Sequence, residues 1–359
     1  MTYRVVQWGT GNVGRLALRA IINHPELDLV GLVVHSPEKD GRDAGAIVGL
    51  PPTGVDATTD PDQALATQPD CVSYMATGDL RPDDAVADMC RTLELGINVV
   101  STSVVPLVYP PATERRLVAP LEQACAAGNS SCFTSGIDPG FANDLVPLTL
   151  LGVCERVDRV RVMEVLDYAT YEQPTVLFET MGFGKPIDET PLLLLPGVLS
   201  LAWGATVGIL AAGLGVTLDG VEEHYEKFAA EHDYDLGFGV VPTGTMAGLR
   251  FEVRGIVGGE PRIVLEHVTR IGPDVAPDWP ALPGQGGYRV QIDGNPSISC
   301  DLQLVGEDGD HNTGGVLATG MRMLNAIPAV CEAPAGVLST LDLPLVTGRG
   351  LMRVPTGSS

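Results

Sequence analysis

The sequence predicts an α/β protein: a Rossmann domain with a doubly wound parallel sheet, followed by an α+β domain with a mixed or antiparallel sheet. Residues 1–150 alternate strand-like and helix-like patterns, as doubly wound domains do. From about 151 to 312, strand-like runs follow one another with few helices, which is typical of a mixed or antiparallel sheet. A chain of 359 residues is long enough for two such cores.

The first strand is expected at 3–8, and it runs directly into a GxGxxG turn and a helix over 15–23. In a βαβ unit of this kind, the first glycine permits the tight turn, the second lets the backbone approach a pyrophosphate, and the third allows close helix packing. Phosphate then binds the free N–H groups where the helix begins. We therefore predict a dinucleotide site at the turn, which consists of Gly9, Thr10, Gly11, Asn12, Val13 and Gly14.

The polar residues after the second strand, expected at 29–34, favour NADP(H) over NAD(H). NAD-selective sites carry Asp or Glu at the tip of this strand, whereas this chain has His35 and Ser36, with Lys39 and Arg42 close behind. These groups suit a 2′-phosphate, because charge-assisted bonds to phosphate are the stronger kind. Use of NAD(H) stays open, since Glu38 can turn inward and spoil the cationic site.

Three more strands are expected in the first domain, at 71–75, 98–101 and 131–134, with helices at 83–95 and 111–127. Ligands bind beyond the carboxyl ends of the strands in such a sheet. These ends carry small residues that suit a backbone lying close to ribose and nicotinamide, namely Ala76-Thr77-Gly78, Thr102-Ser103 and Ser135-Gly136.

The second domain, 151–312, is expected to hold the substrate and to form dimer contacts. Its strands are predicted at 157–166, 245–257, 262–270, 287–293 and 297–305. The insertion 171–236 has a helical pattern, so we interpret His224, Glu231 and His232 as a solvated helix face rather than a metal site. A C-terminal segment, 313–359, is expected to pack back on the Rossmann domain, with a helix over 314–326 that Pro328 ends.

Composition narrows the range of partners. The formal net charge of −23 argues against nucleic acids and anionic membranes, since both are bound through clustered Lys and Arg. The seven cysteines are scattered without a CxxC pair, which predicts neither a disulfide framework nor a zinc site, and no metal is expected. With no apolar signal region before the first strand, the expected compartment is the cytoplasm.

One uncharged stretch, 190–218, is apolar enough to suggest a membrane helix. Pro196 and several glycines break it into shorter pieces, and cationic flanks are missing on both sides. We therefore predict a buried helix or a subunit interface there, and no membrane association.

Several segments together resemble one family, the native amine dehydrogenases and 2,4-diaminopentanoate dehydrogenases, whose N-terminal domain is related to dihydrodipicolinate reductase. The segments are WGTGNVG at 8–14, VVHSPEKDGRDAG at 33–45, GIDPGFANDL at 136–145, HNTGGVLATGMRMLNAIPAVCEAPAG at 311–336 and DLPLVTGR at 342–349. Their order along nearly the whole chain makes the resemblance specific. The paired-histidine and lysine motif of dihydrodipicolinate reductase is missing, so that activity is not expected.

The resemblance implies an NAD(P)H-dependent enzyme that makes or breaks a C–N bond on a small molecule, with an active site between the domains and a homodimer as the usual assembly. It places Thr10, Asn12 and Val13 at the pyrophosphate, and His35, Ser36 and Lys39 around the adenosine ribose. It also places Ala76, Thr77 and Thr102 near the nicotinamide ribose, with Asn312 and Thr313 closing the nicotinamide side.

One departure from the family concerns the acid or base. Amine-forming members share a glutamate just after the fifth strand, which can deprotonate ammonia, whereas this chain reads Ser101 to Leu107 without an acid. Losing such a group costs a factor of about 10²–10⁴ in rate. Six replacement candidates lie in the loop after the sixth strand and around the first strand of the second domain: Asp138, Asp144, Glu164, Asp167, Tyr168 and Tyr171. Each also has a structural explanation as a turn, cap, buried pair or packing residue. Asp138, Glu164 and Tyr168 are the favoured three.

A substrate pocket is predicted from residues near these candidates, namely Val104, Phe141, Asn143, Tyr168, Tyr171, Phe178, Met181 and Trp279. The favoured function is reductive amination or imine reduction, with ammonia as the co-substrate. Two alternatives stay open: a carbonyl reductase without amination, and a catalytically silent NADPH-binding sensor.

Overall fold

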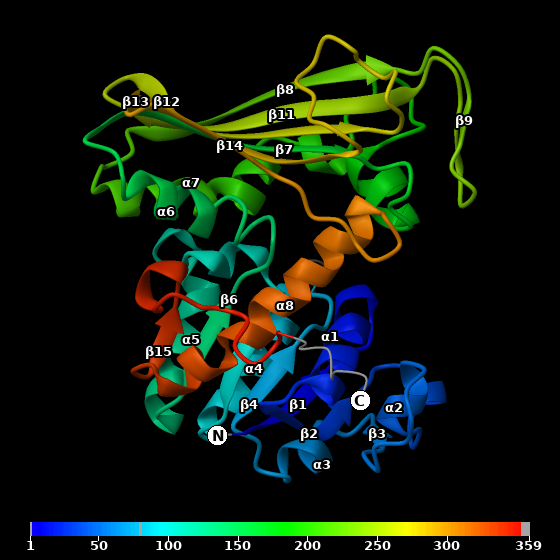
Figure 1. The fold of residues 1–359 in the computed structure, drawn as a ribbon, viewed down its shortest axis with the longest axis vertical. Helices are drawn as coiled ribbons and strands as arrows, with labels where there is room; N and C mark the ends of the chain where they lie inside the picture. The colour runs from blue at the N-terminus through cyan, green and yellow to red at the C-terminus, as the bar shows by residue number, and fades with distance from the viewer. Residues whose placement is uncertain (1, 79–80, 353–359) are drawn as a thin grey trace, which may run out of the picture. The chain divides into compact units, whose positions relative to one another are not determined.

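The structure is a computed structural model that describes residues 2–78 and 81–352. The chain divides into two compact units, one made of Met1–Gly136 with Val316–Ser359 and the other of Ile137–Gly315. Figure 1 shows each with its own sheet, in blue to cyan with red for the first unit and in green to yellow for the second. The predicted combination of a Rossmann domain with a second α+β domain is confirmed.

The sheet of the first unit has seven parallel strands in the order β15-β6-β5-β4-β1-β2-β3. The strands are β1 Tyr3–Trp8, β2 Leu27–Val33, β3 Ala57–Thr58, β4 Cys71–Tyr74, β5 Asn98–Ser101, β6 Ser131–Thr134 and β15 Gly336–Leu338. All five strands predicted for this domain are present. The two that the sequence analysis missed, β3 and β15, are three residues long or less, too short for a visible pattern.

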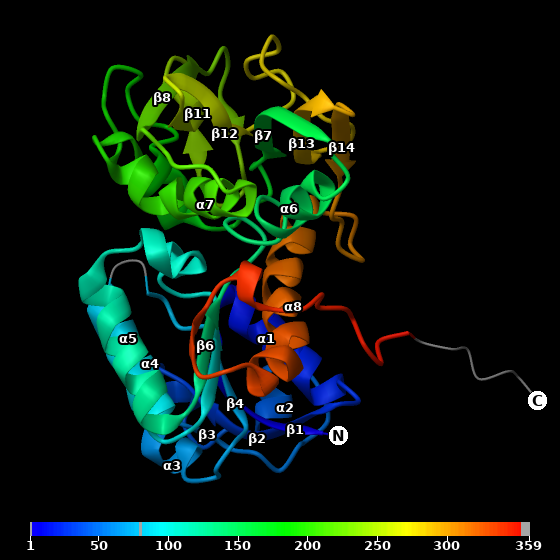
Figure 2. The same ribbon diagram turned by 90° about the vertical axis from the view of Figure 1, so that its left-hand side faces the viewer.

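Helices cover both faces of this sheet, as Figure 2 shows. Helices α4 Pro82–Glu94 and α5 Arg115–Gly128 pack on one face, and α1 Asn12–Asn23 and α8 His311–Glu332 pack on the other. The short helices α2 Ala44–Ile47 and α3 Pro61–Leu65 lie in the connections around β3. A doubly wound sheet is thereby complete.

The prediction that Pro328 ends the last helix is wrong, because α8 continues to Glu332 with Pro328 inside it. A proline within a helix costs about 3 kcal/mol. Here the turn around Pro328 is held by burial, since Ile327 and Val330 are fully buried against the strands. Apolar packing therefore outweighs the lost hydrogen bond.

The second unit contains a six-stranded mixed sheet in the order β14-β13-β7-β12-β11-β8. Only the β7 and β12 pair is parallel, and the other neighbours are antiparallel. The strands are β7 Arg156–Asp167, β8 Gly220–Ala229, β11 Met246–Val257, β12 Glu260–Arg270, β13 Gly286–Asn295 and β14 Ile298–Leu302. The five strands predicted for this domain are confirmed.

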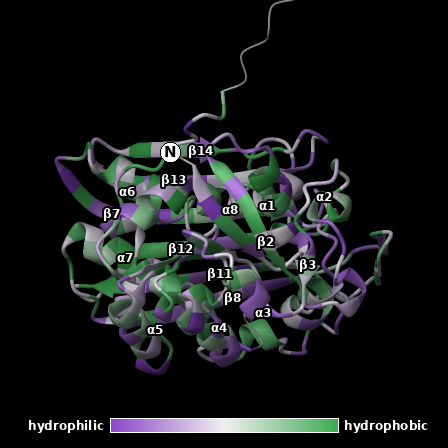
Figure 3. Ribbon diagram, turned by 90° about the horizontal axis from the view of Figure 1, so that it is seen from below, coloured by the Kyte–Doolittle hydropathy of each residue, from purple (hydrophilic) through white to green (hydrophobic). Residues whose placement is uncertain are grey.

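Two helices, α6 Leu145–Leu151 and α7 Val198–Leu214, contact the sheet of the second unit. Helix α7 is the apolar stretch that could be mistaken for a membrane segment, and it is green to pale along its length in Figure 3. Val207 and Leu210 are fully buried in the core beside Phe251 of the sheet. No helix among residues 2–78 and 81–352 is long and apolar enough to span a membrane.

The predicted helical insertion 171–236 is only partly correct. It contains a π-helix, Thr175–Met181, a 3₁₀ turn, Leu192–Leu194, and α7, but it also contains strand β8. A small hairpin, β9 Tyr234–Asp235 with β10 Val240–Val241, follows. Most residues of β8 are exposed, because an edge strand faces water and carries charges in place of apolar alternation. His224 therefore lies on a strand and not on a helix.

Candidate active site

The turn between β1 and α1 has the shape that a dinucleotide phosphate needs. Gly9 has a φ of +98°, and a Cβ added there would lie 2.8 Å from the Met75 carbonyl oxygen. A Cβ at Gly14 would lie 2.3 Å from the carbonyl oxygen of Gly9, whereas one at Gly11 would meet no atom within 4 Å. Two glycines are thus required for packing, and the third leaves open space in which a pyrophosphate can approach the start of α1.

A cation lies beside this turn. Lys39 Nζ donates a hydrogen bond of 3.0 Å to Thr10 Oγ1. Ser36 is half-buried, whereas His35, Glu38 and Arg42 are exposed. The segment after β2 therefore presents a hydroxyl and an ammonium group, and the acidic side chains of Glu38 and Asp40 in it are exposed.

The carboxyl end of β6 holds two hydroxyls that lack partners. Within the described chain, the Oγ1 atom of Thr134 and the Oγ atom of Ser135 are buried without a hydrogen bond. Buried polar atoms are nearly always satisfied, so each orphan needs an explanation. A ligand at this edge of the sheet would supply the missing partners. Of the residues predicted near the nicotinamide ribose, Ala76 and Thr102 are half-buried and Thr77 is exposed.

Val104 occupies the place where the family's glutamate is expected, and its backbone is unusual. Its φ is +58°, and its side chain is 2% exposed. A β-branched residue in the left-handed region is a genuine outlier, costing about 1–3 kcal/mol, and such residues cluster at functional sites. The chain keeps a special geometry after β5 although the acid is missing.

A row of four side chains crosses the sheet of the second unit. In the strand registers, Tyr288 on β13 is opposite Glu164 on β7, Glu164 is opposite His267 on β12, and His267 is opposite Phe251 on β11. Side chains directly opposite one another on neighbouring strands are in contact. The rings of Phe251 and His267 are stacked at 4.7 Å and 10°. All four residues are at most 5% exposed.

His267 lies between two carboxylates. Its Nδ1 atom is 3.3 Å from Glu164 Oε1, and its Nε2 atom is 3.2 Å from Asp138 Oδ2. Each carboxylate has a further donor: Tyr168 Oη donates to Glu164 Oε1 at 2.9 Å, and Trp203 Nε1 on α7 donates to Asp138 Oδ1 at 2.9 Å. The Trp203 ring also packs on His267 at 4.7 Å.

These contacts set the charge of the cluster. Burial alone would lower the pKa of His267, but Asp138 and Glu164 raise it to about 10. His267 is therefore an imidazolium at neutral pH. Burial and the nearby Glu164 carboxylate hold the pKa values of Tyr168 and Tyr288 well above their usual range. The cluster therefore holds one imidazolium between two buried carboxyl groups.

The donor atoms of Asp138, Glu164 and His267 all lie within 4.8 Å of one another, a spacing that a metal ion could bridge. Metal binding requires a deprotonated imidazole nitrogen. Here each ring nitrogen faces a different carboxylate, and together they stabilise the protonated ring. The arrangement fits a bound proton better than a bound metal.

The structure thus brings together the three predicted acid or base candidates, Asp138, Glu164 and Tyr168. The sequence analysis missed His267, Trp203 and Tyr288. One signal was available for His267, because strand alternation places it on the same face as the apolar Ile263 and Leu265. Its carboxylate partners could not be identified without the strand register.

The predicted pocket residues are scattered through the second unit, apart from Val104. The Tyr171 ring lies 4.7 Å from that of Tyr168. Asn143 accepts a hydrogen bond from the Gly140 amide, and its Nδ2 atom is buried without a partner within the described chain. Phe141 is half-buried nearby. Phe178 and Met181 lie on the π-helix, where the Phe178 ring packs on Phe238.

Trp279 and the pair Asn312 and Thr313 lie elsewhere. Trp279 packs with Met163 and Val165, which alternation places on the sheet face opposite Glu164, so the structure does not bring it to the cluster. Asn312 Nδ2 donates to the Asp167 carbonyl oxygen at 3.1 Å and to Thr170 Oγ1 at 2.9 Å. The Thr313 amide donates to Asp310, which caps α8 as expected.

Comparison with known proteins finds similarity to amine dehydrogenases and 2,4-diaminopentanoate dehydrogenases in sequence, and to an amine dehydrogenase in fold. Residues 141–353 match the model of the 2,4-diaminopentanoate dehydrogenase C-terminal domain. An amine dehydrogenase from Streptomyces virginiae is 42% identical over 95% of this chain and 96% of its own. A 2,4-diaminopentanoate dehydrogenase from Acetoanaerobium sticklandii is 26% identical over 70% of this chain and 68% of its own. The solved structure of an amine dehydrogenase from Mycobacterium smegmatis has a similar fold, with a TM-score of 0.78 at 21% identity over 97% of this chain and 98% of that chain.

The charge on His267 should make stability depend on pH in a way that His267→Gln removes. The pKa of His267 is raised from 6.5 to about 10 on folding, so its stabilising contribution is complete below the lower value and is lost as the pH rises through the upper one. The difference in unfolding free energy between the unaltered protein and the variant should therefore be largest in mild acid and shrink toward pH 10. Urea unfolding measures it.

The matched control is His232→Gln, because His232 is exposed beside Asp274. It should leave the stability curve almost unchanged. A difference for His267→Gln that stays constant across this pH range would show that folding does not raise the pKa of His267.

Proposed function

We propose that this chain, which belongs to the family of amine dehydrogenases and 2,4-diaminopentanoate dehydrogenases, reductively aminates a small ketone or aldehyde with ammonia. It is an NAD(P)H-dependent oxidoreductase acting on a C–N bond. The observation that carries the proposal is the buried cluster of Asp138, Glu164, His267 and Tyr168. It supplies buried carboxyl groups in contact with an imidazolium and a phenol, in a chain that lacks the family's glutamate.

The reaction needs groups that move protons near the reacting carbon. Ammonium must lose a proton before it attacks a carbonyl, the resulting hydroxyl must gain one to leave as water, and a hydride then reduces the iminium. Glu164 and Tyr168 can accept and return these protons, and carboxylates placed near the reacting carbon favour a cationic iminium. The turn at 9–14, with Ser36 and Lys39, would hold NAD(P)H, which when bound would supply the hydride.

In this proposal each domain has its own task. The first unit, Met1–Gly136 with Val316–Ser359, binds the dinucleotide, and the second unit, Ile137–Gly315, acts on the substrate and forms dimer contacts, so the expected boundary at residue 150 moves to residue 136. Asn312 and Thr313 are proposed to face the nicotinamide, and the pocket residues are those predicted from the sequence, without Trp279.

The seven cysteines are all free thiols, which supports a reducing, cytoplasmic location. Cell fractionation tests this location.

Ammonia dependence decides the proposed activity. With a panel of ketones and aldehydes, NADPH oxidation should require ammonia, and methylamine should replace it only where the pocket admits the extra methyl group. A carbonyl reductase would work equally well without ammonia. A sensor would bind NADPH and oxidise none of it across the panel.

Val104→Glu is a check on where the reacting carbon lies. A gain in the ammonia-dependent rate would place that carbon next to the loop after β5. Loss of folding or of NADPH binding would instead mean that this buried position cannot take a carboxylate, and the site would have to be placed elsewhere.

The enzyme should bind NADPH more tightly than NADH. Lys39 is held at the phosphate turn by Thr10, and Ser36 is half-buried beside it. Each charge-assisted bond contributes about 1.5–3 kcal/mol, so Ser36→Ala with Lys39→Ala should lower the preference by roughly 10-fold or more. Fluorescence titration measures both affinities, with Lys185→Ala as the control. Equal affinities in the unaltered protein would refute the preference.

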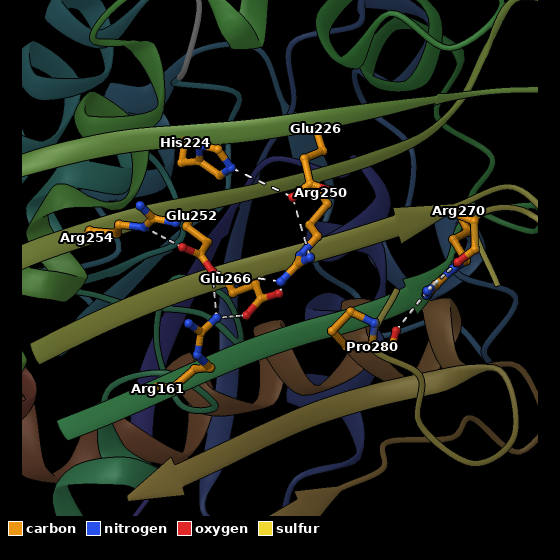
Figure 4. Close-up of polar contacts among 10 residues, drawn as sticks. Arg161, His224, Glu226, Arg250, Glu252, Arg254, Glu266, Arg270 and Pro280 are labelled. Carbon is orange, nitrogen blue, oxygen red and sulfur yellow. Dashed lines mark hydrogen bonds and ion pairs between the residues drawn. The ribbon is translucent and has the colours of Figure 1, made fainter. Parts of the chain in front are cut away.

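We also propose a homodimer that packs through the sheet face opposite α7. Figure 4 shows an ion-pair network there. Arg161 contacts both Glu252 and Glu266, Arg250 Nε lies 2.8 Å from Glu266, and Arg254 Nε lies 2.5 Å from Glu252. Glu252 and Glu266 are almost fully buried. Alternating charges of this kind suit a second copy of the same face packed sheet on sheet.

Sedimentation should therefore give twice the chain mass of 37.7 kDa. Arg254→Glu places like charges side by side and should shift the equilibrium toward monomer, more so at low salt. A monomer in the unaltered protein would rule the proposed assembly out.

A further inference from the structure

The two carboxylates beside His267 receive different kinds of donor. Asp138 is contacted by the Trp203 indole N–H and by the His267 imidazolium. An indole N–H donates only, and a protonated imidazole also donates only. Neither partner can accept a proton from a substrate and pass it to Asp138. Through these two contacts, therefore, Asp138 cannot receive a proton from a substrate.

Glu164 has partners that can pass a proton. The Tyr168 hydroxyl donates to Glu164 Oε1 at 2.9 Å, and Tyr288 is directly opposite Glu164 in the strand register. A phenol hydroxyl both donates and accepts, so it can take a proton from a substrate while giving its own to the carboxylate. The charged and titratable groups that face His267 are Asp138 and Glu164, with Tyr168 and Tyr288 behind Glu164 and the Trp203 and Phe251 rings on either side.

We infer that Tyr168 and Glu164 form the proton relay of this enzyme, and that Asp138 and His267 are positioning residues that keep their own protonation states throughout the cycle. The inference rests on the proposed amination. His267 contributes a fixed positive charge that keeps Glu164 ionised and oriented. Asp138, fixed by Trp203, keeps His267 charged in turn.

The protons balance over the cycle. An ammonium N–H gives its proton to the Tyr168 oxygen as the Tyr168 proton moves to Glu164, which leaves ammonia and a neutral carboxylic acid. After ammonia has added to the carbonyl, the same proton returns through Tyr168 to the hydroxyl group, the C–O bond breaks, and water leaves. Because both protons move together, no phenolate forms. This agrees with a phenol whose pKa burial has raised.

The test compares the two carboxylates by kinetics in the full-length enzyme. Glu164→Gln and Tyr168→Phe should each lower the ammonia-dependent kcat by about 10²–10⁴-fold and leave the NADPH affinity unchanged. Glu164→Gln should also remove the acid limb of the pH profile of kcat. Asp138→Asn should keep that limb. Tyr225→Phe, at a 41% exposed tyrosine on the edge strand β8, is the matched control and should match the unaltered enzyme.

His267→Gln should shift the pH profile of kcat, a change that is not expected if His267 has a purely structural role. Without the imidazolium, two buried carboxylates repel each other, and one takes up a proton more readily. The acid limb of its pH profile should therefore move to higher pH. If Asp138→Asn fails to fold, the double variant Asp138→Asn with His267→Gln keeps the net charge of the cluster and should retain the limb.

The results that would overturn the proposed function differ from those that would overturn the proton relay alone. An unaltered enzyme that does not need ammonia overturns the proposed function, and the inference with it. An unaltered enzyme that needs ammonia, combined with a Glu164→Gln variant of full rate and unchanged pH profile, overturns the inference alone. Loss of the acid limb in Asp138→Asn or in the double variant would assign the proton transfer to Asp138 instead.

Discussion

The contact on which the site depends is the imidazolium of His267 held between Asp138 and Glu164. Two carboxylates this deeply buried could not both stay ionised without a cation, because desolvation and mutual repulsion favour their neutral forms. His267 supplies that cation from the neighbouring strand, and Phe251 and Trp203 pack against the ring. The positive charge of His267 follows from its contacts with Asp138 and Glu164, which Trp203 and Tyr168 hold by hydrogen bonds of their own.

The chain departs from its family in the loop after β5, where the family's glutamate is expected and no acid is present. Val104 occupies the buried position after β5 where an acid would lie, and it keeps a backbone conformation that valine rarely adopts. A strained backbone persists only where the surrounding structure holds it. The chain therefore has a held, unusual backbone after β5, whereas its buried acids, Asp138 in the loop before α6 and Glu164 on β7, belong to the second unit.

The sequence was sufficient for the periodic parts of the fold. Buried parallel strands and the strands of the mixed sheet have clear apolar patterns, so ten strands could be placed, and the GxGxxG turn predicted a dinucleotide site. Strand β8 was missed because its residues mostly face water, and α8 continued past Pro328 because packing overrode a local stop signal. For the site, Asp138, Glu164 and Tyr168 were found as separate candidates. His267 was missed because its role depends on the register of β12 against β7, which no local pattern contains.

The most direct measurement of the central interaction is long-range ¹H–¹⁵N NMR of the protein labelled in its six histidines. One histidine should keep both ring nitrogens protonated through pH 8, well above the ordinary imidazole pKa of about 6.5, and that signal should be absent from His267→Gln. A spectrum in which every histidine is neutral at pH 8 would contradict the account, since two ionised carboxylates could not then be held together in the core.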